Sequence, residues 1–374
     1  MDTSTNRFAF VVHPLDLSYI YRHPRFGWTK YLPGRIVEEI GAWLPPLYLG
    51  QITGGESPIT GQKILGFLYT LGATPRQIKR HGERFINQRL LMAAKMAQQH
   101  GARLMGLGAY TSIVGDAGKT LAAQTNIAIT TGNSLTVAVT IETARTALQR
   151  LGIHEMRNVQ AMVVGATGSI GSACARMLAK EVYAVILAST DSVKLDILQR
   201  RIELETPGVQ VLSTVDANAL SGECDLIITA TSATGGRILD ITKCHSGAVI
   251  YDVARPPDVS RQEAELRPDV LVVEGGEVVF PGNINFGYDF RLPVNTAFAC
   301  LAETALLAME GRFESFTIGR DLSLARIHEI HELFHKHKFH IAPIRSFGAP
   351  LSDTDFDYAR TFNTRLMHES SRGQ

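Results

Sequence analysis

The strongest indication of the fold in this chain is the run Val163-Val164-Gly165-Ala166-Thr167-Gly168-Ser169-Ile170-Gly171. It follows an apolar stretch typical of a buried strand and opens a helical pattern. Its three glycines permit a tight turn, a close backbone approach to a pyrophosphate at a helix N-terminus, and close packing of helix on strand. The spacing is GxxGxxG rather than GxGxxG, so the alternative is a turn that only packs helix on strand and binds no nucleotide. We expect a dinucleotide cofactor to contact the whole turn: Gly165, Ala166, Thr167, Gly168, Ser169, Ile170 and Gly171.

Around this turn, short β-rich runs alternate with helical ones, which is the pattern of a parallel α/β sheet. The sequence therefore predicts an α/β protein with a Rossmann-type doubly wound parallel sheet at residues 158–285. An N-terminal α/β substrate domain at 1–157, C-terminal helices at 286–345 and a polar, mobile tail at 346–374 flank it. Expected strands cover residues 160–164, 184–188, 209–212, 225–230, 248–253 and 270–273, and expected helices cover 75–100, 136–151, 294–310 and 325–337.

The composition excludes several classes of protein. The 374 residues carry 37 Lys and Arg against 36 Asp and Glu, so no net field attracts nucleic acid, and 45% hydrophobic residues suffice for two or three packed domains. No stretch approaches the roughly 20 apolar residues of a transmembrane segment, and residues 1–19 lack the layout of a signal peptide. The four cysteines are scattered without CxxC pairs, which argues against a disulfide scaffold or a zinc cluster. We therefore expect a cytoplasmic protein with reduced thiols at Cys174, Cys224, Cys244 and Cys300.

The segment after the second strand of the nucleotide domain would hold the cofactor ribose. Asp191 lies 20 residues beyond Gly171, where an acid binds the ribose 2′-hydroxyl of NADH. Ser189, Thr190 and Lys194 surround it with hydroxyls and a cation, which would equally hold the 2′-phosphate of NADPH. Asp191 is also placed to cap a helix that begins near residue 192. These residues leave the choice between NADH and NADPH open.

Four blocks of sequence, in matching order and spacing, carry a resemblance that spans roughly residues 8–345: Leu107-Gly108-Ala109-Tyr110-Thr111-Ser112-Ile113, Thr130-Thr131-Gly132-Asn133, Val164-Gly165-Ala166-Thr167-Gly168-Ser169-Ile170-Gly171-Ser172 and Phe298-Ala299-Cys300-Leu301-Ala302-Glu303. They resemble the cyanobacterial-type long-chain acyl-[acyl-carrier-protein] reductases, which make fatty aldehydes from acyl thioesters with NADPH. The resemblance implies this activity, with acyl-carrier protein or acyl-CoA as acyl donor and an aldehyde-consuming enzyme as a further partner. It also implies that Cys300 is the nucleophile. One departure concerns the cofactor phosphate, for which the family usually places an Arg where this chain has Thr190.

Reduction of a thioester needs a nucleophile that takes the acyl group. A thiolate is suited to this, because exchange between thioesters is nearly thermoneutral. Cys300 stands about one turn into the helix expected at 294–310, and the helix N-terminus would lower its pKa, although a small buried side chain is the alternative role. Donors to the developing oxyanion are expected at Thr131, Asn133 and Ser112, whose alternative role is in loops and caps. His13 is expected to be structural rather than a proton-transfer group.

Three further segments have both functional and structural interpretations. Residues 43–49, Trp-Leu-Pro-Pro-Leu-Tyr-Leu, are apolar enough to line an acyl tunnel, to join a core or to make peripheral membrane contact. Residues 76–95 carry six cations against one acid, which suits an acidic carrier protein or a solvated face. The segment His331-Glu332-Leu333-Phe334-His335 matches the HExxH zinc pattern, yet the glycine and third ligand of such enzymes are missing. We therefore expect a solvated histidine-rich helix and no metal site.

Two other functions are compatible with the same fold. One is a non-covalent NAD(P) oxidoreductase of the shikimate-dehydrogenase-like kind, in which Cys300 belongs to the core. The other is a nucleotide-binding sensor or scaffold without catalysis. An acyl adduct on Cys300 would separate a covalent reductase from both.

Overall fold

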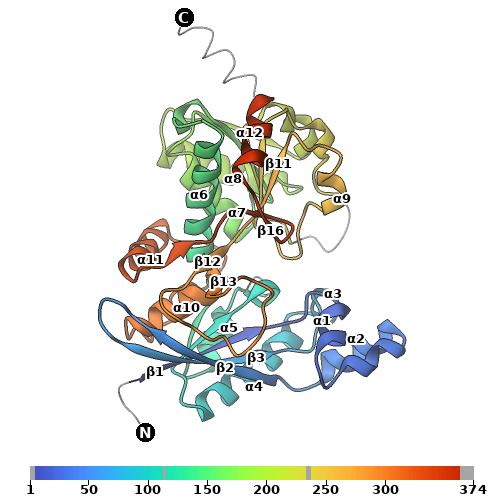
Figure 1. The fold of residues 1–374 in the computed structure, drawn as a ribbon, viewed down its shortest axis with the longest axis vertical. Helices are drawn as coiled ribbons and strands as arrows, with labels where there is room; N and C mark the ends of the chain where they lie inside the picture. Colours follow the sequence, from blue (N-terminus) through green and yellow to red (C-terminus); the bar gives the residue numbers. More distant parts are fainter. Residues whose placement is uncertain (1–4, 113–114, 233–236, 363–374) are drawn as a thin grey trace, which may run out of the picture. The chain divides into compact units, whose positions relative to one another are not determined.

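The computed structural model describes residues 5–112, 115–232 and 237–362 (Figure 1). The chain forms two compact units: the first combines Met1–Thr136 with Glu277–His340, and the second combines Val137–Gly276 with Ile341–Gln374. These bounds differ from the four segments expected at 1–157, 158–285, 286–345 and 346–374. The difference arises because α10 (Ala299–Met309), expected in a separate helical segment, packs against strands of the first unit.

A five-stranded sheet in the order β2-β3-β1-β4-β5 organises the first unit. Its strands run parallel except β2, which pairs antiparallel with β3. Ala9 and Val11 of β1 join a core that includes the apolar face of α4, while Phe8 and Phe10 point to the other face by strand alternation. α10 packs on that second face, so α4 and α10 cover opposite faces of the sheet (Figure 1). The strands are β1 (Thr5–Val12), β2 (Leu47–Glu56), β3 (Lys63–Thr70), β4 (Leu104–Leu107) and β5 (Ala128–Thr130).

The helix expected at 75–100 is two helices. α3 ends at His81 and α4 begins at Glu83, because Gly82 between them has φ of +80°, a left-handed conformation that ends a helix. The other predicted helix of this unit, at 325–337, is α11. The helices of the first unit are α1 (Leu17–Arg22), η1 (Gly27–Tyr31), α2 (Gly34–Trp43), α3 (Pro75–His81), α4 (Glu83–Gln99), η2 (Ala109–Ser112), α5 (Lys119–Gln124), α10 and α11 (Leu324–Lys336), where η marks a 3₁₀ helix.

A six-stranded sheet in the order β11-β10-β9-β6-β7-β8 organises the second unit, and every neighbouring pair is parallel. Counted along the chain from β6, the strand order from the β8 edge is 3-2-1-4-5-6, which defines a Rossmann-type sheet. The predicted α/β fold with a doubly wound parallel sheet is confirmed. The strands are β6 (Gln160–Val164), β7 (Ala184–Ala188), β8 (Gln210–Thr214), β9 (Leu226–Thr229), β10 (Val249–Asp252) and β11 (Leu271–Glu274).

Part of the tail expected to be mobile has regular structure. α12 (Asp353–Thr361) begins at a capping box formed by Ser352 and Asp355, and it buries Phe356. Residues 363–374 of the expected tail lie outside the described residues. The remaining elements are α6 (Asn133–Arg150), η3 (Met156–Asn158), α7 (Ser169–Leu178), α8 (Ser192–Glu205), η4 (Ala217–Ala219), η5 (Ser221–Glu223), η6 (Ile241–Lys243), α9 (Arg261–Ala264), β12 (Glu277–Val279), β13 (Thr296–Phe298), β14 (His340–Ile341), β15 (Arg345–Ser346) and β16 (Ala349–Pro350).

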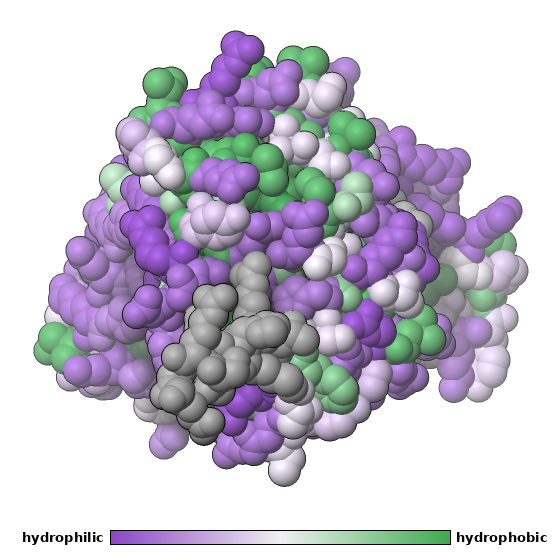
Figure 2. Space-filling model, turned by 90° about the horizontal axis from the view of Figure 1, so that it is seen from above, coloured by the Kyte–Doolittle hydropathy of each residue, from purple (hydrophilic) through white to green (hydrophobic). Residues whose placement is uncertain are grey.

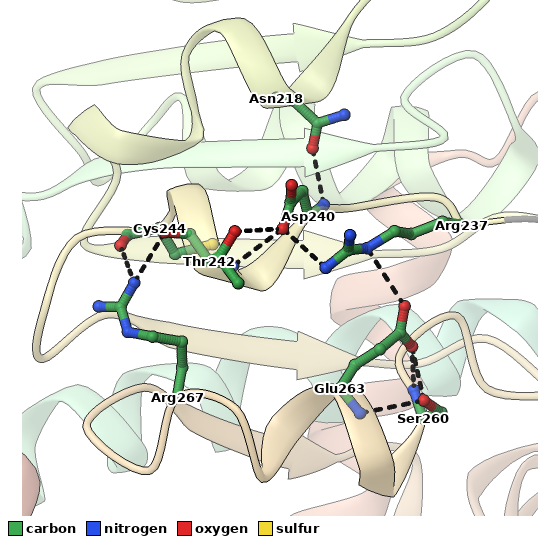
Figure 3. A network of polar contacts seen from close by, with 8 residues as sticks. All are labelled: Asn218, Arg237, Asp240, Thr242, Cys244, Ser260, Glu263 and Arg267. Carbon is green, nitrogen blue, oxygen red and sulfur yellow. Dashed lines mark hydrogen bonds and ion pairs between the residues drawn. The ribbon is translucent and has the colours of Figure 1, made fainter.

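Three of the four cysteines, Cys174, Cys224 and Cys244, are buried in the second unit. Burial raises the pKa of the Cys174 thiol to about 12 and that of Cys244 to about 11. Figure 3 shows the polar network around Cys244, in which the Arg267 guanidinium donates to the Cys244 carbonyl oxygen at 3.0 Å. These positions agree with the structural role expected for the three thiols.

In the described part of the chain, no helix is both long enough and apolar enough to cross a bilayer. On the face drawn in Figure 2, hydrophobic side chains lie in small groups among hydrophilic ones.

Candidate active site

Cys300 is the second residue of α10. The helix expected from residue 294 begins only at Ala299, because residues 296–298 form β13, which pairs with β12. Cys300 therefore lies in the first turn of the helix rather than one turn into it. It is also the one cysteine among the four that is not fully buried. Cys300 thus combines a place at a helix N-terminus with partial exposure of the residue.

The loop between β5 and α6 touches Cys300 with its backbone. Gly132 has φ of +72°, and a Cβ on it would lie 2.3 Å from both Cα and Cβ of Cys300. Real Cβ atoms do not approach other carbons so closely, so only glycine allows this contact. Thr131 and Asn133, predicted as oxyanion donors, flank Gly132 in the same loop.

Thr131 and Asn133 are both buried and carry unsatisfied polar atoms. Within the described residues, Thr131 Oγ1 and Asn133 Nδ2 have no hydrogen-bond partner. The Asn133 side-chain oxygen Oδ1 lies 3.4 Å from Ser112 Oγ, whose hydroxyl donates to the Ala109 carbonyl oxygen at 2.7 Å, and this connects the third predicted residue to the same group. Buried polar groups are nearly always paired in native structures, so orphaned donors on the two residues that flank Gly132 suit a bound oxygen of a substrate.

The turn at residues 108–112 approaches the thiol from another strand end. Ala109 has φ of +50°, an uncommon conformation for a residue with a side chain, and its backbone N–H faces the Cys300 sulfur. The next N–H, of Tyr110, donates to His13 Nε2 at 2.9 Å, while His13 Nδ1 lies 3.0 Å from the Pro14 carbonyl oxygen. His13 is therefore neutral, with its proton on Nδ1, and burial lowers its pKa to about 4. It holds the turn and has no nitrogen left for proton transfer, as expected.

Glu303 is a residue of the site that sequence reasoning missed. It is fully buried on α10, accepts from the Leu135 N–H at 2.9 Å, and binds the Thr130 hydroxyl. Its carboxyl group thus holds both ends of the loop that carries Gly132, at the N-terminus of α6. Burial raises the pKa of Glu303, against the opposing hydrogen bonds of Thr130 and Leu135. The available signal was a lone acid in the otherwise uncharged run 297–309.

The expected lowering of the Cys300 pKa is wrong. Burial raises the pKa of the Cys300 thiol to about 11, more than the N–H groups of Ala109 and Leu301 lower it, and the nearby Glu303 carboxylate adds to the rise. The helix N-terminus favours a thiolate, but removal of water from the sulfur opposes it more strongly. The resting thiol is therefore protonated at neutral pH.

The glycine turn of the second unit has the geometry that its residues predict. Gly165 has φ of +80°, and a Cβ on it would lie 2.8 Å from the Ala230 carbonyl oxygen. A Cβ on Gly171 would lie 2.3 Å from the Gly165 oxygen. Gly168 is the N-cap of α7 and makes no side-chain cap. The turn follows β6, next to β9, where the strand order reverses and where ligands bind in such sheets.

Not every backbone donor of the turn is available to a ligand. The N–H groups of Gly165 and Ala166 both donate to the Ala188 carbonyl oxygen, at 2.9 and 3.1 Å. Ser169 and Ile170 lie in the first turn of α7, where N–H groups lack intrahelical acceptors. A pyrophosphate at this helix end would therefore meet these groups first.

The ribose segment is organised by hydrogen bonds among its own residues. Thr167 Oγ1 and Ser189 Oγ lie 2.6 Å apart. Asp191 caps α8 by accepting from the Lys194 N–H at 3.1 Å, and its other oxygen lies 2.7 Å from Lys194 Nζ. These bonds from Lys194 lower the pKa of Asp191. The capping role is thus shown, Thr190 is exposed beside it, and the preference between NADH and NADPH stays open.

The histidine-rich helix α11 is only partly solvated. His331 Nε2 and His335 Nε2 lie 3.1 Å apart on it. His337, at its C-terminal end, is fully buried, with Nδ1 2.7 Å from Ser57 Oγ and Nε2 bound to the Glu310 carboxylate. The expectation of a solvated helix is therefore wrong for His337. The expectation that this helix holds no metal site stays a prediction.

Fold and site define a class: a Rossmann-type α/β protein whose other unit presents a cysteine at a helix start, against a glycine loop. No protein-family model matches the chain. It is similar to the aminotransferase PigE of a Serratia species, with 33% identity over 271 residues, which cover 71% of this chain and 31% of PigE. The chain thus spans about a third of that relative's length. It is also similar to the long-chain acyl-[acyl-carrier-protein] reductase of Synechococcus elongatus, with 28% identity over 330 residues, 84% of this chain and 92% of the reductase. These values show a distant relationship.

Solved structures add only weak likenesses. L-tryptophan dehydrogenase from Nostoc punctiforme is 12% identical, covering 99% of this chain and 89% of that chain, with a TM-score of 0.41. Quinate dehydrogenase from Corynebacterium glutamicum is 14% identical, covering 88% and 99%, with a TM-score of 0.40. Likenesses at this level carry no argument about function.

Proposed function

We propose that this protein is an NAD(P)H-dependent reductase that converts acyl thioesters to aldehydes through a covalent adduct on Cys300. The observation that carries the proposal is the Cys300 site: a partly exposed cysteine at a helix start, a backbone N–H from Ala109 facing its sulfur, and orphaned donors on Thr131 and Asn133. The similarity to the Synechococcus elongatus acyl-[acyl-carrier-protein] reductase supports the same chemistry.

Acyl transfer to Cys300 balances as an exchange of thiols. The sulfur attacks the thioester carbonyl carbon, the bond from that carbon to the donor sulfur breaks, and the Cys300 proton leaves with the donor thiol. Because the resting pKa is about 11, the proton must move as the bond forms. The Thr131 hydroxyl and the Asn133 amide would donate to the carbonyl oxygen as negative charge develops on it, a contribution of a few kcal/mol per donor.

The glycine turn of the second unit would hold NADPH or NADH. Gly165 and Gly171 support this, because a side chain at either position would meet neighbouring backbone and distort the turn. A bound nicotinamide supplies a hydride. Reduction of the acyl group on Cys300 by hydride and a proton releases the aldehyde and restores the thiol. Where the resembling family usually has an Arg, this chain has Thr190, and Lys194 is the cation that remains in the ribose segment. We propose NADPH as the cofactor, as in that family, with NADH as the alternative.

The acyl donor is proposed to be acyl-carrier protein or acyl-CoA. The basic stretch 76–95 is a candidate docking surface for an acidic carrier. Two of its cations are already paired, Arg76 with Glu38 and Arg80 with Glu39, whereas Lys79, Arg84 and Lys95 are exposed. Replacing Lys79 and Arg84 by Glu should raise KM for acyl-carrier protein and leave KM for acyl-CoA unchanged. An unchanged KM for acyl-carrier protein, or the same change in KM for both donors, would remove this surface from the proposal.

The proposal is tested by mass spectrometry after incubation with palmitoyl-CoA in the absence of cofactor. The expected result is a palmitoyl adduct on the peptide that contains Cys300, absent from Cys300→Ala, with buried Cys174 as an internal control. NADPH oxidation without any adduct would instead support a non-covalent dehydrogenase. Cofactor binding without turnover would support a sensor.

The ribose segment is tested separately by cofactor turnover. Thr190→Arg should favour NADPH by adding a cation, and Asp191→Ala should disturb the start of α8 and weaken NADH use. Unchanged preference in both variants would show that the ribose lies elsewhere.

A further inference from the structure

Helix α2 faces its largest apolar side chains outward. Its buried face holds Val37, Glu38, Gly41 and Ala42, and a Cβ on Gly41 would lie 3.0 Å from the Gly72 carbonyl oxygen. The opposite face presents Ile36, Ile40 and Trp43, which are 49%, 56% and 55% exposed. Spacings of four and three residues place these three on one side of the helix. This is the reverse of the usual amphipathic helix, whose large apolar residues face the core.

The segment before α2 also exposes large apolar side chains. Trp28 and Tyr31 of η1 are 61% and 81% exposed, and Leu32 follows them. Trp28 is fixed by a hydrogen bond from its ring nitrogen to the Arg25 carbonyl oxygen at 3.2 Å. We define the aromatic–basic face as the apolar residues Trp28, Tyr31, Leu32, Ile36, Ile40 and Trp43, together with the cations Arg22, Arg25, Lys30 and Arg35.

The charge of this face is positive. Residues 17–37 contain four cations and no acid. Within the described residues, none of the four forms an ion pair, and Arg22 and Lys30 instead lie over the Tyr19 and Tyr31 rings. The acids that follow, Glu38 and Glu39, are held by Arg76 and Arg80. The four cations therefore remain free for an anionic surface.

The composition of the face indicates its occupant. Residues 17–43 contain no Asn or Gln, and the face offers rings, aliphatic chains and cations. Tryptophan and tyrosine rings with aliphatic side chains enter the headgroup region of a bilayer, and Lys and Arg meet its anionic lipids. We infer that the aromatic–basic face docks the protein on an anionic lipid surface.

The chain provides its own reporter for this docking, because Trp28 and Trp43 are its only two tryptophans and both lie on the face. The full chain is mixed with phosphatidylcholine vesicles, with or without phosphatidylglycerol. The expected result is a blue shift of tryptophan emission and quenching by brominated acyl chains, with anionic vesicles and at low salt. Each removed cation should weaken binding about fivefold.

Matched variants separate docking from general stickiness. Ile40→Ser should weaken vesicle binding about tenfold, whereas Ile197→Ser, a 64% exposed isoleucine on α8, should leave it unchanged. Both positions are exposed, so the thermal midpoint should barely move in either variant. An unshifted emission with anionic vesicles would overturn the inference. So would an emission shift that acyl-carrier protein produces and anionic vesicles do not, or one that depends only on protein concentration.

Discussion

Substitution of Gly132 by Ala should displace Cys300 from its working position. A left-handed φ of +72° costs a residue with a Cβ about 1 to 2 kcal/mol, and forcing an extra carbon into a packed site costs about 1 to 3 kcal/mol. The loss of folding free energy should therefore be about 2 to 5 kcal/mol. Ordinary contact for a Cβ begins near 3.4 Å and the new atom would lie at 2.3 Å, so the loop and Cys300 must separate by about 1 Å.

A displacement of that size should reduce acyl transfer to Cys300 about 100-fold. The assay is the rate of palmitoyl adduct formation by mass spectrometry, with urea unfolding to measure stability. Gly61→Ala is the matched control, because Gly61 has φ of +68° and a Cβ on it meets nothing within 4 Å. Gly61→Ala should lose only the about 1 to 2 kcal/mol of folding free energy that the left-handed φ costs, and it should keep the wild-type transfer rate. A folded Gly132→Ala variant that transfers acyl groups at the wild-type rate would refute the reasoning.

Three further predictions follow from the same geometry. Burial sets the Cys300 pKa at about 11, so its alkylation by iodoacetamide should rise about tenfold per pH unit from pH 7 and level off only near pH 11; a plateau below pH 8 would contradict this. Burial lowers the His13 pKa to about 4, so between pH 6.5 and 4 the unfolded chain binds a proton on His13 that the folded chain does not. The free energy of unfolding should therefore fall by up to about 3 kcal/mol as pH drops from 6.5 to 4. His13→Gln should flatten that slope in urea unfolding, and an unchanged slope would count against it. Gly171→Ala should weaken NADPH binding in calorimetry at least about tenfold, because its Cβ would meet the Gly165 oxygen at 2.3 Å. Gly208→Ala, in open space at φ of +93°, should bind normally, and equal affinities would remove Gly171 from the site.

The nucleotide unit was predictable because its signals are local. β6 and β7 coincide with the expected strands at 160–164 and 184–188, since continuous apolar runs bounded by turn residues specify buried parallel strands. The three glycines report backbone conformation and close packing directly. The edge strand β8 is displaced by a residue or two from its expected place, because one of its faces is half-exposed and its pattern is weaker.

The Cys300 site was less predictable because it is assembled from distant segments. The resemblance singles out Cys300, Thr131 and Asn133, but the register of β13 with β12 decides where α10 begins. The thiol pKa depends on how completely neighbouring loops exclude water, which no local pattern encodes. Glu303 could not be assigned a role from sequence, because its partners Thr130 and Leu135 lie about 170 residues away.

The most direct test of the central claim isolates the acyl-enzyme and follows its fate. Protein labelled on Cys300 with palmitoyl-CoA is freed of excess donor and then mixed with NADPH. The adduct should disappear at the same rate at which hexadecanal appears, with one aldehyde formed per adduct. An adduct that persists while aldehyde forms from added thioester would contradict it, because Cys300 would then lie outside the reaction path.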